Sequence, residues 1–186
     1  NKKVCFSMIR FGNVLESSGS VIPLFKNQIM KGGPVTITHP QVYRYFMTIP
    51  QAVHLVLQSS FLAKGGEVFI LDMGEPVSIR DMAIKLIQLS GNSIKTDTHP
   101  EGDIEIKVVG LRPGEKLHEE LLIDAEAQIT KHPLIFMAKD QFFEDEQFFD
   151  KLELLRKNIH SYKKKEVFKI LSDLVPEWKK SKDLKN

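Results

Sequence analysis

The chain has 186 residues, of which 42% are hydrophobic and 27% charged, and its formal net charge is +2 at pH 7. This composition excludes a fully disordered protein, and the small net charge gives no electrostatic signature of nucleic-acid binding. A single cysteine, Cys5, and the lack of any run of ~20 apolar residues exclude an intrachain disulfide and a membrane-spanning helix, so we expect a cytoplasmic segment without membrane contact.

The first part of the chain predicts a strand, a helix and a second strand. Residues 4–11 are apolar on both faces, which is typical of a strand buried in a parallel sheet. A Ser/Gly loop follows, and Ser20 stands where it can cap a helix over residues 21–31. A Gly-Gly pair ends that helix, and the β-branched segment 34–38 predicts a short strand.

Two capping patterns predict the next helices. Thr48 is followed three residues later by Gln51, and this capping box predicts a helix that runs to about Leu62. We expect four of its apolar residues to form one buried face: Ala52, Val53, Val56 and Leu57. Ser78 and Asp81 repeat the capping pattern and predict another helix.

Further strand-like segments complete an alternation of strands and helices. Residues 67–73 and 103–109 predict strands, and units of strand, helix and strand indicate an α/β fold. The motif GLRPGEK then breaks the pattern with a turn at Pro113 and Gly114. After it, KLHEELL, residues 116–122, predicts a short helix.

From about residue 125 the pattern becomes helical. Residues 144–159 and 167–174 carry apolar residues at helical spacing, which predicts a C-terminal helical pair packed against the rest of the chain. The sequence therefore predicts one domain over residues 1–124 and a helical extension over residues 125–186.

Several catalytic and cofactor motifs are absent from the sequence. The six histidines have no spacing suited to a metal site, and there is no Gly-x-Ser-x-Gly nucleophile motif. There is also no Gly-rich dinucleotide fingerprint, no P-loop and no Tyr followed four residues later by Lys. We therefore expect no metal site, and no dinucleotide held by this chain alone.

Three polar residues stand where they could meet a ligand. Arg44 lies between aromatic residues in a loop before a helix, and Arg112 lies in the rigid GLRPGEK turn. A guanidinium held in this way suits a phosphate or carboxylate, and an ordinary surface ion pair is an equal alternative. Asn13 follows the first strand, where ligands bind in open α/β sheets, and its alternative is a turn-forming role after Gly12.

Six segments, in this order, carry a resemblance to a known family: RFGNVLESSGSVIPLF, GGPVTITHP, RYFMTIPQA, VFILDMGEPVSI, GDIEI and GLRPGEKLHEELL. They closely resemble the C-terminal half of CapD-like polysaccharide biosynthesis proteins, which are nucleotide-sugar 4,6-dehydratases of the extended short-chain dehydrogenase/reductase superfamily. The resemblance covers residues 4–137. It implies an α/β fold made of late Rossmann strands, a small substrate-binding α/β domain and C-terminal helices.

The resemblance also implies a function for the whole protein. Such enzymes use NAD(P) to convert UDP-N-acetylglucosamine to a 4-keto-6-deoxy sugar in surface polysaccharide biosynthesis, and we expect a homo-oligomer. The resemblance places the cofactor fingerprint and the catalytic Tyr/Lys pair upstream of Asn1, so we expect this chain to be inactive by itself. A UDP-sugar 4-epimerase and a standalone sugar-nucleotide binding module are the alternatives.

The resemblance implies site residues position by position. Asn13 matches the Asn that approaches the nicotinamide and the substrate phosphates, and Arg44 and Arg112 match two arginines that clamp the diphosphate. Glu115 matches an acidic residue near the nucleotide ribose. Further positions lie along the nucleotide or beside uracil: Ser20, Val21, Pro23, Ile37 and Thr38. Glu16 stands where many relatives would have Gly, which points to a positive φ that a Glu resists.

Overall fold

The computed structural model describes residues 4–17, 19–119, 127–138 and 147–176. The chain folds into two compact units, residues 1–140 and 141–186. The sequence instead places its boundary after residue 124. Two strands that follow this boundary, β10 (Ala127–Ile129) and β11 (Ile135–Ala138), pair within the first unit.

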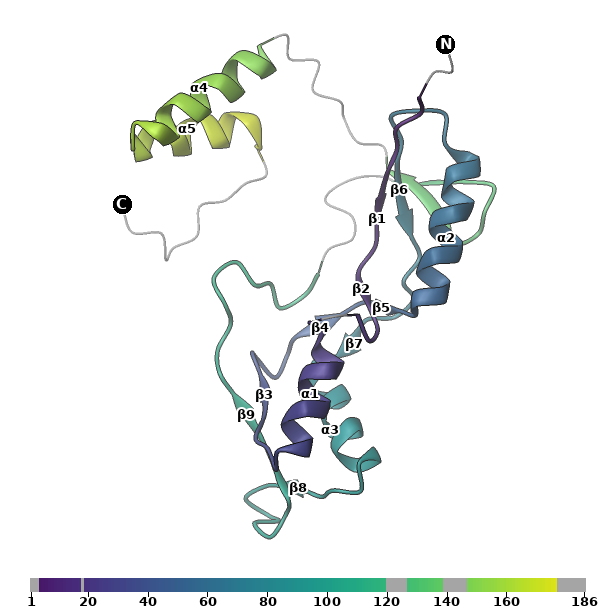
Figure 1. Cartoon of the computed structure of the whole chain (residues 1–186), viewed down its shortest axis with the longest axis vertical. Coiled ribbons are helices and arrows are strands. Elements are labelled where there is room, and N and C mark those ends of the chain that lie inside the picture. Colours follow the sequence, from purple (N-terminus) through teal and green to yellow (C-terminus); the bar gives the residue numbers. More distant parts are fainter. Residues whose placement is uncertain (1–3, 18, 120–126, 139–146, 177–186) are drawn as a thin grey trace. The chain divides into compact units, whose positions relative to one another are not determined.

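The first unit contains a four-stranded sheet in the order β1-β6-β11-β10 (Figure 1). β1 (Met8–Arg10) runs parallel to β6 (Val68–Leu71), and β11 runs antiparallel to β6. All four residues of β6 are buried, as its run of apolar residues predicts. The helix α2 (Ile49–Leu62) packs on this sheet through residues that share one core: Ala52, Leu55, Phe69, Leu71 and Ile135.

β1 differs from its prediction as a buried strand over residues 4–11. The strand covers three residues, and the side chain of Phe6 just before it is 76% exposed. Among the described strands β1 pairs only with β6, so it is an edge strand and not the central strand that its apolar run predicts. An apolar run thus identified a strand correctly but did not determine whether both of its faces are covered.

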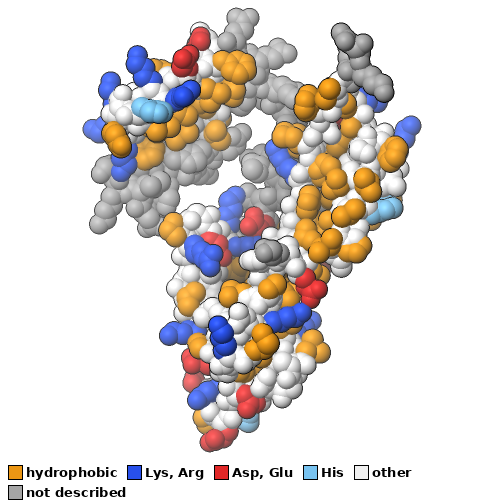
Figure 2. Space-filling view, viewed as in Figure 1, with side chains coloured by type: hydrophobic (Ala, Val, Ile, Leu, Met, Phe, Trp, Pro, Cys, Tyr) orange, Lys and Arg blue, Asp and Glu red, His pale blue; other side chains and the backbone are white. Residues whose placement is uncertain are grey.

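The buried face of α2 also differs from its prediction. Two of the four predicted residues face the core, since Ala52 is buried and Val56 packs against the core, whereas Val53 and Leu57 are exposed. Leu55 and Ser59, which the prediction does not include, are also buried. Figure 2 shows hydrophobic side chains over this helix, where Ile49, Val53, Leu57 and Phe61 are exposed at every fourth position. Because α2 is apolar on both sides, its periodicity could not identify the face that packs on the sheet.

A second core lies between two helices and a three-stranded parallel sheet. The helices are α1 (Val21–Met30) and α3 (Ile79–Leu89), and the strand order is β3-β9-β8. The strands are β3 (Val35–Ile37), β9 (Ile104–Val108) and β8 (Ile94–Lys95), as the sequence predicts for the first two. Phe25, Val35 and Ile87 are almost fully buried in this core.

Two short strand pairs lie between these parts of the first unit. β2 (Asn13–Val14) runs parallel to β5 (Phe46–Met47), and β4 (Tyr43–Arg44) runs antiparallel to β7 (Val77–Ser78). These ladders fix the backbone of two predicted site residues, Asn13 and Arg44, so their positions depend on partners distant in the sequence.

The capping predictions for α2 and α3 are confirmed. Thr48 Oγ1 accepts a hydrogen bond from the backbone N–H of Gln51, and Gln51 Oε1 accepts one from the N–H of Thr48. Ser78 Oγ accepts a hydrogen bond from the N–H of Asp81 at 3.1 Å. Ser20 occupies the N-cap position of α1, but its side chain makes no capping hydrogen bond.

The short helix predicted over residues 116–122 does not begin within its described part. Residues 116–119 are non-helical, and His118 forms a parallel bridge with Tyr43. The carbonyl of Leu117 accepts the N–H of Tyr43 at 3.0 Å. Pairing with a distant segment therefore replaces the local helix, and residues 120–122 lie outside the described part of the chain.

The second unit contains the predicted helical pair, α4 (Phe148–His160) and α5 (Lys164–Leu174). The two helices pack against each other, with Asn158 and Ile170 buried. The prediction of α4 from residue 144 includes residues 144–146, which lie outside the described part. None of the helices in the described residues is long and apolar enough to cross a membrane.

Candidate functional site

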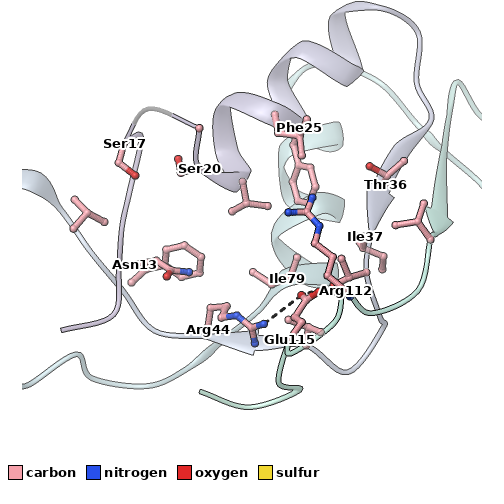
Figure 3. Close-up of a pocket in the computed structure, with 18 residues that line it drawn as sticks. Asn13, Ser17, Ser20, Phe25, Thr36, Ile37, Arg44, Ile79, Arg112 and Glu115 are labelled. Carbon is pink, nitrogen blue, oxygen red and sulfur yellow. Dashed lines mark hydrogen bonds and ion pairs between the residues drawn. The ribbon is translucent and has the colours of Figure 1, made fainter. Parts of the chain in front are cut away.

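A pocket of about 430 Å³ lies at the N-terminus of α1, within the first unit (Figure 3). Eight of the nine substrate-site residues that the sequence predicts line it: Asn13, Ser20, Val21, Ile37, Thr38, Arg44, Arg112 and Glu115. Pro23, the ninth, is not among its lining residues. The fold thus gathers residues from five separate stretches of sequence into one cavity, while their functional roles stay predictions.

The sequence analysis identified only Val21 and Ile37 of the apolar lining of this pocket. The apolar lining residues that it missed are Val14, Leu24, Phe25, Val42, Phe46, Ile79 and Val109. Phe25 and Val42 are almost fully buried and also belong to the second core. Periodicity marks such positions as core but does not show that one side of the core borders a cavity.

A second cavity, of about 600 Å³, lies beside the N-terminus of α2. Its lining includes His54, Asp72 and His132, and none of the nine predicted substrate-site residues. In the part of the chain that the structure describes, no group of three or more His, Cys, Asp or Glu side chains could hold a metal ion. We therefore take the pocket at α1 as the candidate site.

The N-terminus of α1 forms one wall of the candidate pocket. The first N–H groups of a helix have no partner within the helix and carry a partial positive charge, so they favour anions. Ser20 Oγ is buried and has no hydrogen-bond partner in the described structure. An unpartnered hydroxyl beside these N–H groups is an additional donor that a ligand could use.

Arg44 is buried, and its guanidinium is already held by protein groups. Nη1 donates to the carbonyls of Tyr43 and Leu117 at 2.8 and 3.2 Å. Nη2 donates to Glu115 Oε1 at 3.3 Å, and Nε lies 3.4 Å from Glu119 Oε1. An ion pair, one of the two alternatives that the sequence leaves open for Arg44, is thus present, but it is buried and not on the surface. These contacts leave few donors of Arg44 for a ligand.

Glu115 connects several parts of the pocket wall. Its Oε1 also accepts a hydrogen bond from Thr38 Oγ1 at 2.7 Å, and its Oε2 accepts one from the backbone N–H of Arg112 at 3.0 Å. Burial by itself raises the pKa of Glu115, but these hydrogen bonds and the charges of Arg44 and Arg112 outweigh burial and hold the pKa below its ordinary value. The carboxyl is therefore ionised at neutral pH.

Arg112 is exposed and lies in the tight turn that the sequence predicts. The N–H of Glu115 donates to the Arg112 carbonyl at 2.9 Å, which closes the turn. In Figure 3 the Arg112 side chain extends into the pocket below Phe25. Among the described residues, no hydrogen bond or ion pair engages its guanidinium, so this cation can bind an anionic ligand.

Asn13 is the residue that the family resemblance assigns to the cofactor as well as the substrate. It is exposed, and its backbone N–H donates to the carbonyl of Tyr45 at 2.9 Å. No hydrogen bond engages its side-chain amide within the described residues, and that amide lines the pocket. Asn13 follows the carboxyl end of β1, where open α/β sheets bind ligands, so its position fits an approach to NAD(P).

The loop between Asn13 and α1 has the conformation expected at Glu16. Its φ is +59°, so the expectation of a positive φ at this position is confirmed. Glu16 Oε1 accepts a hydrogen bond from Lys26 Nζ of α1 at 2.7 Å, although both side chains are exposed. This contact joins the strained loop to the helix whose N-terminus forms the pocket wall.

Comparison with known proteins identifies relatives over most of the chain. Residues 1–140 match the model of a family described as "Polysaccharide biosynthesis protein". The "Capsular polysaccharide biosynthesis protein CapD" of Staphylococcus aureus is 51% identical over 185 residues, which are 100% of this chain and 27% of that protein. A "UDP-glucose 4-epimerase" of Rickettsia rickettsii is 38% identical over 117 residues, 63% of this chain and 31% of that protein.

A solved structure also resembles the chain. The X-ray structure of Pen from Bacillus thuringiensis superposes with a TM-score of 0.58 and 38% sequence identity, over 72% of this chain and 39% of that chain. The mixed α/β fold of this chain thus matches part of a larger solved protein. The chain spans 27% of the length of the CapD relative and 31% of the epimerase.

Proposed function

Because the chain belongs to the CapD-like family of polysaccharide biosynthesis proteins, we propose that it is the nucleotide-sugar-binding part of a 4,6-dehydratase that acts on UDP-N-acetylglucosamine. The observation that supports this proposal is the pocket at α1, which combines a helix N-terminus with the unengaged guanidinium of Arg112. Both features favour the diphosphate of a UDP-sugar. The pocket volume lies within the range of small-molecule sites, ~300–1,000 Å³.

The pocket offers a different chemistry for each part of the nucleotide. Apolar side chains such as Phe25, Ile37 and Val109 provide a surface for the uracil ring, and Arg112 with the α1 N-terminus provides cationic donors for the phosphates. Arg44 supports this wall from behind, because its donors already contact protein groups. We assign binding and orientation of the nucleotide to this chain.

The proposed conversion removes one water from the sugar and is redox-neutral overall. NAD(P), when bound, supplies the hydride acceptor and donor for such a reaction. Asn13 is the residue of this chain that we assign to the approach of the cofactor, because its amide follows the carboxyl end of β1 and lines the substrate pocket.

Calorimetric titration of the 186-residue chain with UDP-N-acetylglucosamine, UDP and uridine tests the binding role. We expect UDP to bind at least about tenfold more tightly than uridine, because charge-assisted contacts to phosphate each contribute about 1.5–3 kcal/mol. Arg112→Ala should weaken UDP binding at least about tenfold for the same reason. Arg80→Ala is the matched control, because Arg80 is exposed on α3 outside the pocket lining.

Two results would contradict the binding role. One is a failure of the unaltered chain to bind UDP. The other is an equal loss of affinity in Arg112→Ala and Arg80→Ala, which would show that the effect of Arg112 is not specific to the pocket.

A UDP-sugar 4-epimerase is the second candidate, and the likeness to the Rickettsia epimerase favours it. The two reactions differ in the product, because a dehydratase releases water and an epimerase yields an isomer of equal mass. Liquid chromatography coupled to mass spectrometry of UDP-N-acetylglucosamine incubated with a full-length protein that contains this chain separates them. The mass reveals loss of water, and the retention time distinguishes an isomer from unchanged substrate. Loss of one water supports the dehydratase, an isomer supports the epimerase, and unchanged substrate with tight UDP binding supports a binding module.

A further inference from the structure

We propose that Glu115 is a positioning residue that assembles the phosphate wall of the pocket, defined here as Thr38, Arg44, Arg112 and Glu115. This role rests on the proposed function, since it presumes a diphosphate ligand. The Glu115 carboxylate joins Thr38 at the end of β3, Arg44 in β4 and the backbone of Arg112 in its own turn. Thr38 and Arg44 lie 77 and 71 residues from Glu115 in the sequence.

Each hydrogen-bond partner of the carboxylate supports a different part of the wall. The Arg112 N–H to Oε2 contact closes the turn from inside, so it fixes the backbone from which the Arg112 side chain reaches the pocket. The Thr38 contact anchors that turn to β3, at 2.7 Å. Loss of the Glu115 carboxylate would therefore release the turn that holds Arg112 and its unengaged guanidinium.

Charge gives the carboxylate a second positioning effect. Arg44 and Arg112 line the same pocket, and the positive charges of both help to lower the pKa of Glu115. A carboxylate beside two guanidinium groups offsets their mutual repulsion, so both can stay on one wall. Since the side chain of Glu115 is only 19% exposed, solvent screens these interactions less than it screens surface pairs.

The contacts of Glu115 occupy about three of the four acceptor positions of its carboxylate. Its Oε1 already accepts two hydrogen bonds and its Oε2 accepts one, all from protein groups. A carboxylate used in this way acts through Arg112 and Arg44 and does not need to touch the ligand. Uridine distinguishes the two roles, because it contains the ribose but no phosphate.

The test is calorimetric titration of the full chain and its variants with UDP and with uridine. We expect Glu115→Ala to weaken UDP binding at least about tenfold, as expected for loss of a charge-assisted phosphate contact, and to change uridine binding less than about twofold. Glu115→Gln should lose less UDP affinity than Glu115→Ala, because its amide oxygen can still accept the hydrogen bond from Thr38 or Arg112. Glu105→Ala is the matched control, since Glu105 is exposed on β9 outside the pocket lining.

A double variant shows whether Glu115 acts through Arg112. If it does, the double variant Glu115→Ala with Arg112→Ala should bind UDP about as weakly as Arg112→Ala alone. Once Arg112 is absent, removing the Glu115 carboxylate that positions it has no further effect on UDP binding. Fully additive losses would overturn the positioning role. Uridine binding also reports that each variant keeps a folded pocket.

The remaining outcomes separate this inference from the proposed function. Equal loss of UDP and uridine affinity in Glu115→Ala would indicate a ribose contact or a collapsed pocket and would overturn the inference alone. Tighter UDP binding would show that the carboxylate mainly repels the diphosphate, which also overturns it. If the unaltered chain binds no UDP, the proposed function fails, and the inference fails with it.

Discussion

The structure predicts that the two site arginines have different effects on folding and on binding. Arg44 is buried and contacts two backbone carbonyls and two carboxylates. Arg112 is exposed, and its guanidinium makes no hydrogen bond or ion pair with the described residues. Arg44→Ala should therefore lower the free energy of unfolding, and Arg112→Ala should leave it nearly unchanged. The sequence suggested the same role for both residues, so this contrast tests the structure itself.

The contacts of Arg44 determine how much Arg44→Ala should lower the free energy of unfolding. Each lost hydrogen bond to the carbonyls of Tyr43 and Leu117 contributes about 0.5–1.5 kcal/mol, and depriving the partly buried Glu115 carboxylate of its partner costs about 1–3 kcal/mol. The contact with Glu119 adds little, because that side chain is 48% exposed and screened by solvent. The total is roughly 2–6 kcal/mol, against less than about 0.5 kcal/mol for Arg112→Ala.

Urea denaturation followed by far-UV circular dichroism measures both variants against the unaltered chain. Arg44→Lys is the informative intermediate, because it keeps the charge but cannot reproduce the fork that contacts several acceptors at once. A loss below about 1 kcal/mol in Arg44→Ala would refute the reasoning, since the contacts predict more. An equal loss in Arg112→Ala would refute the assignment of separate roles.

Three further outcomes follow from the structure. Leu71 is fully buried in β6, so Leu71→Ala should lower the free energy of unfolding, measured by urea denaturation, by about 2–5 kcal/mol. Leu89 is exposed, so Leu89→Ala should lower it by less than about 0.5 kcal/mol. Equal losses in the two variants would contradict the core assignment. Glu16→Gly should have a higher urea midpoint than Glu16→Ala, because both lose the Lys26 contact but only Gly relieves the φ of +59°; equal midpoints would contradict this explanation. The pKa of Glu115 is lower in the folded state than in the unfolded state, where it is about 4.3. Ionised Glu115 therefore stabilises the fold fully above about pH 4.3, and this stabilisation is lost as the pH falls through the lower folded-state pKa. The stability advantage of the unaltered chain over Glu115→Gln should therefore shrink as the pH falls below about 4.3, and a constant advantage down to about pH 3 would contradict it.

Local sequence patterns determined the five helices of the described residues and four of their eleven strands, β1, β3, β6 and β9. Thr48 with Gln51 and Ser78 with Asp81 act within four residues of each other, so their hydrogen bonds can be predicted without knowledge of the fold. The turn at Arg112 is equally local, because proline and glycine restrict its backbone. Sequence patterns singled out Asn13, Arg44 and Arg112, and resemblance to a family added six further site residues. The structure brings eight of these nine into one pocket.

Tertiary contacts decided the features that local patterns could not determine. The segment around His118 has a helical pattern but pairs with Tyr43, and α2 is apolar on both sides, so only packing selects its buried face. The different environments of Arg44 and Arg112 depend on the Glu115 carboxylate, which lies 71 residues from Arg44. Such contacts have no signature in a short window of sequence, because the chain must fold before these groups meet and burial can strengthen their interaction.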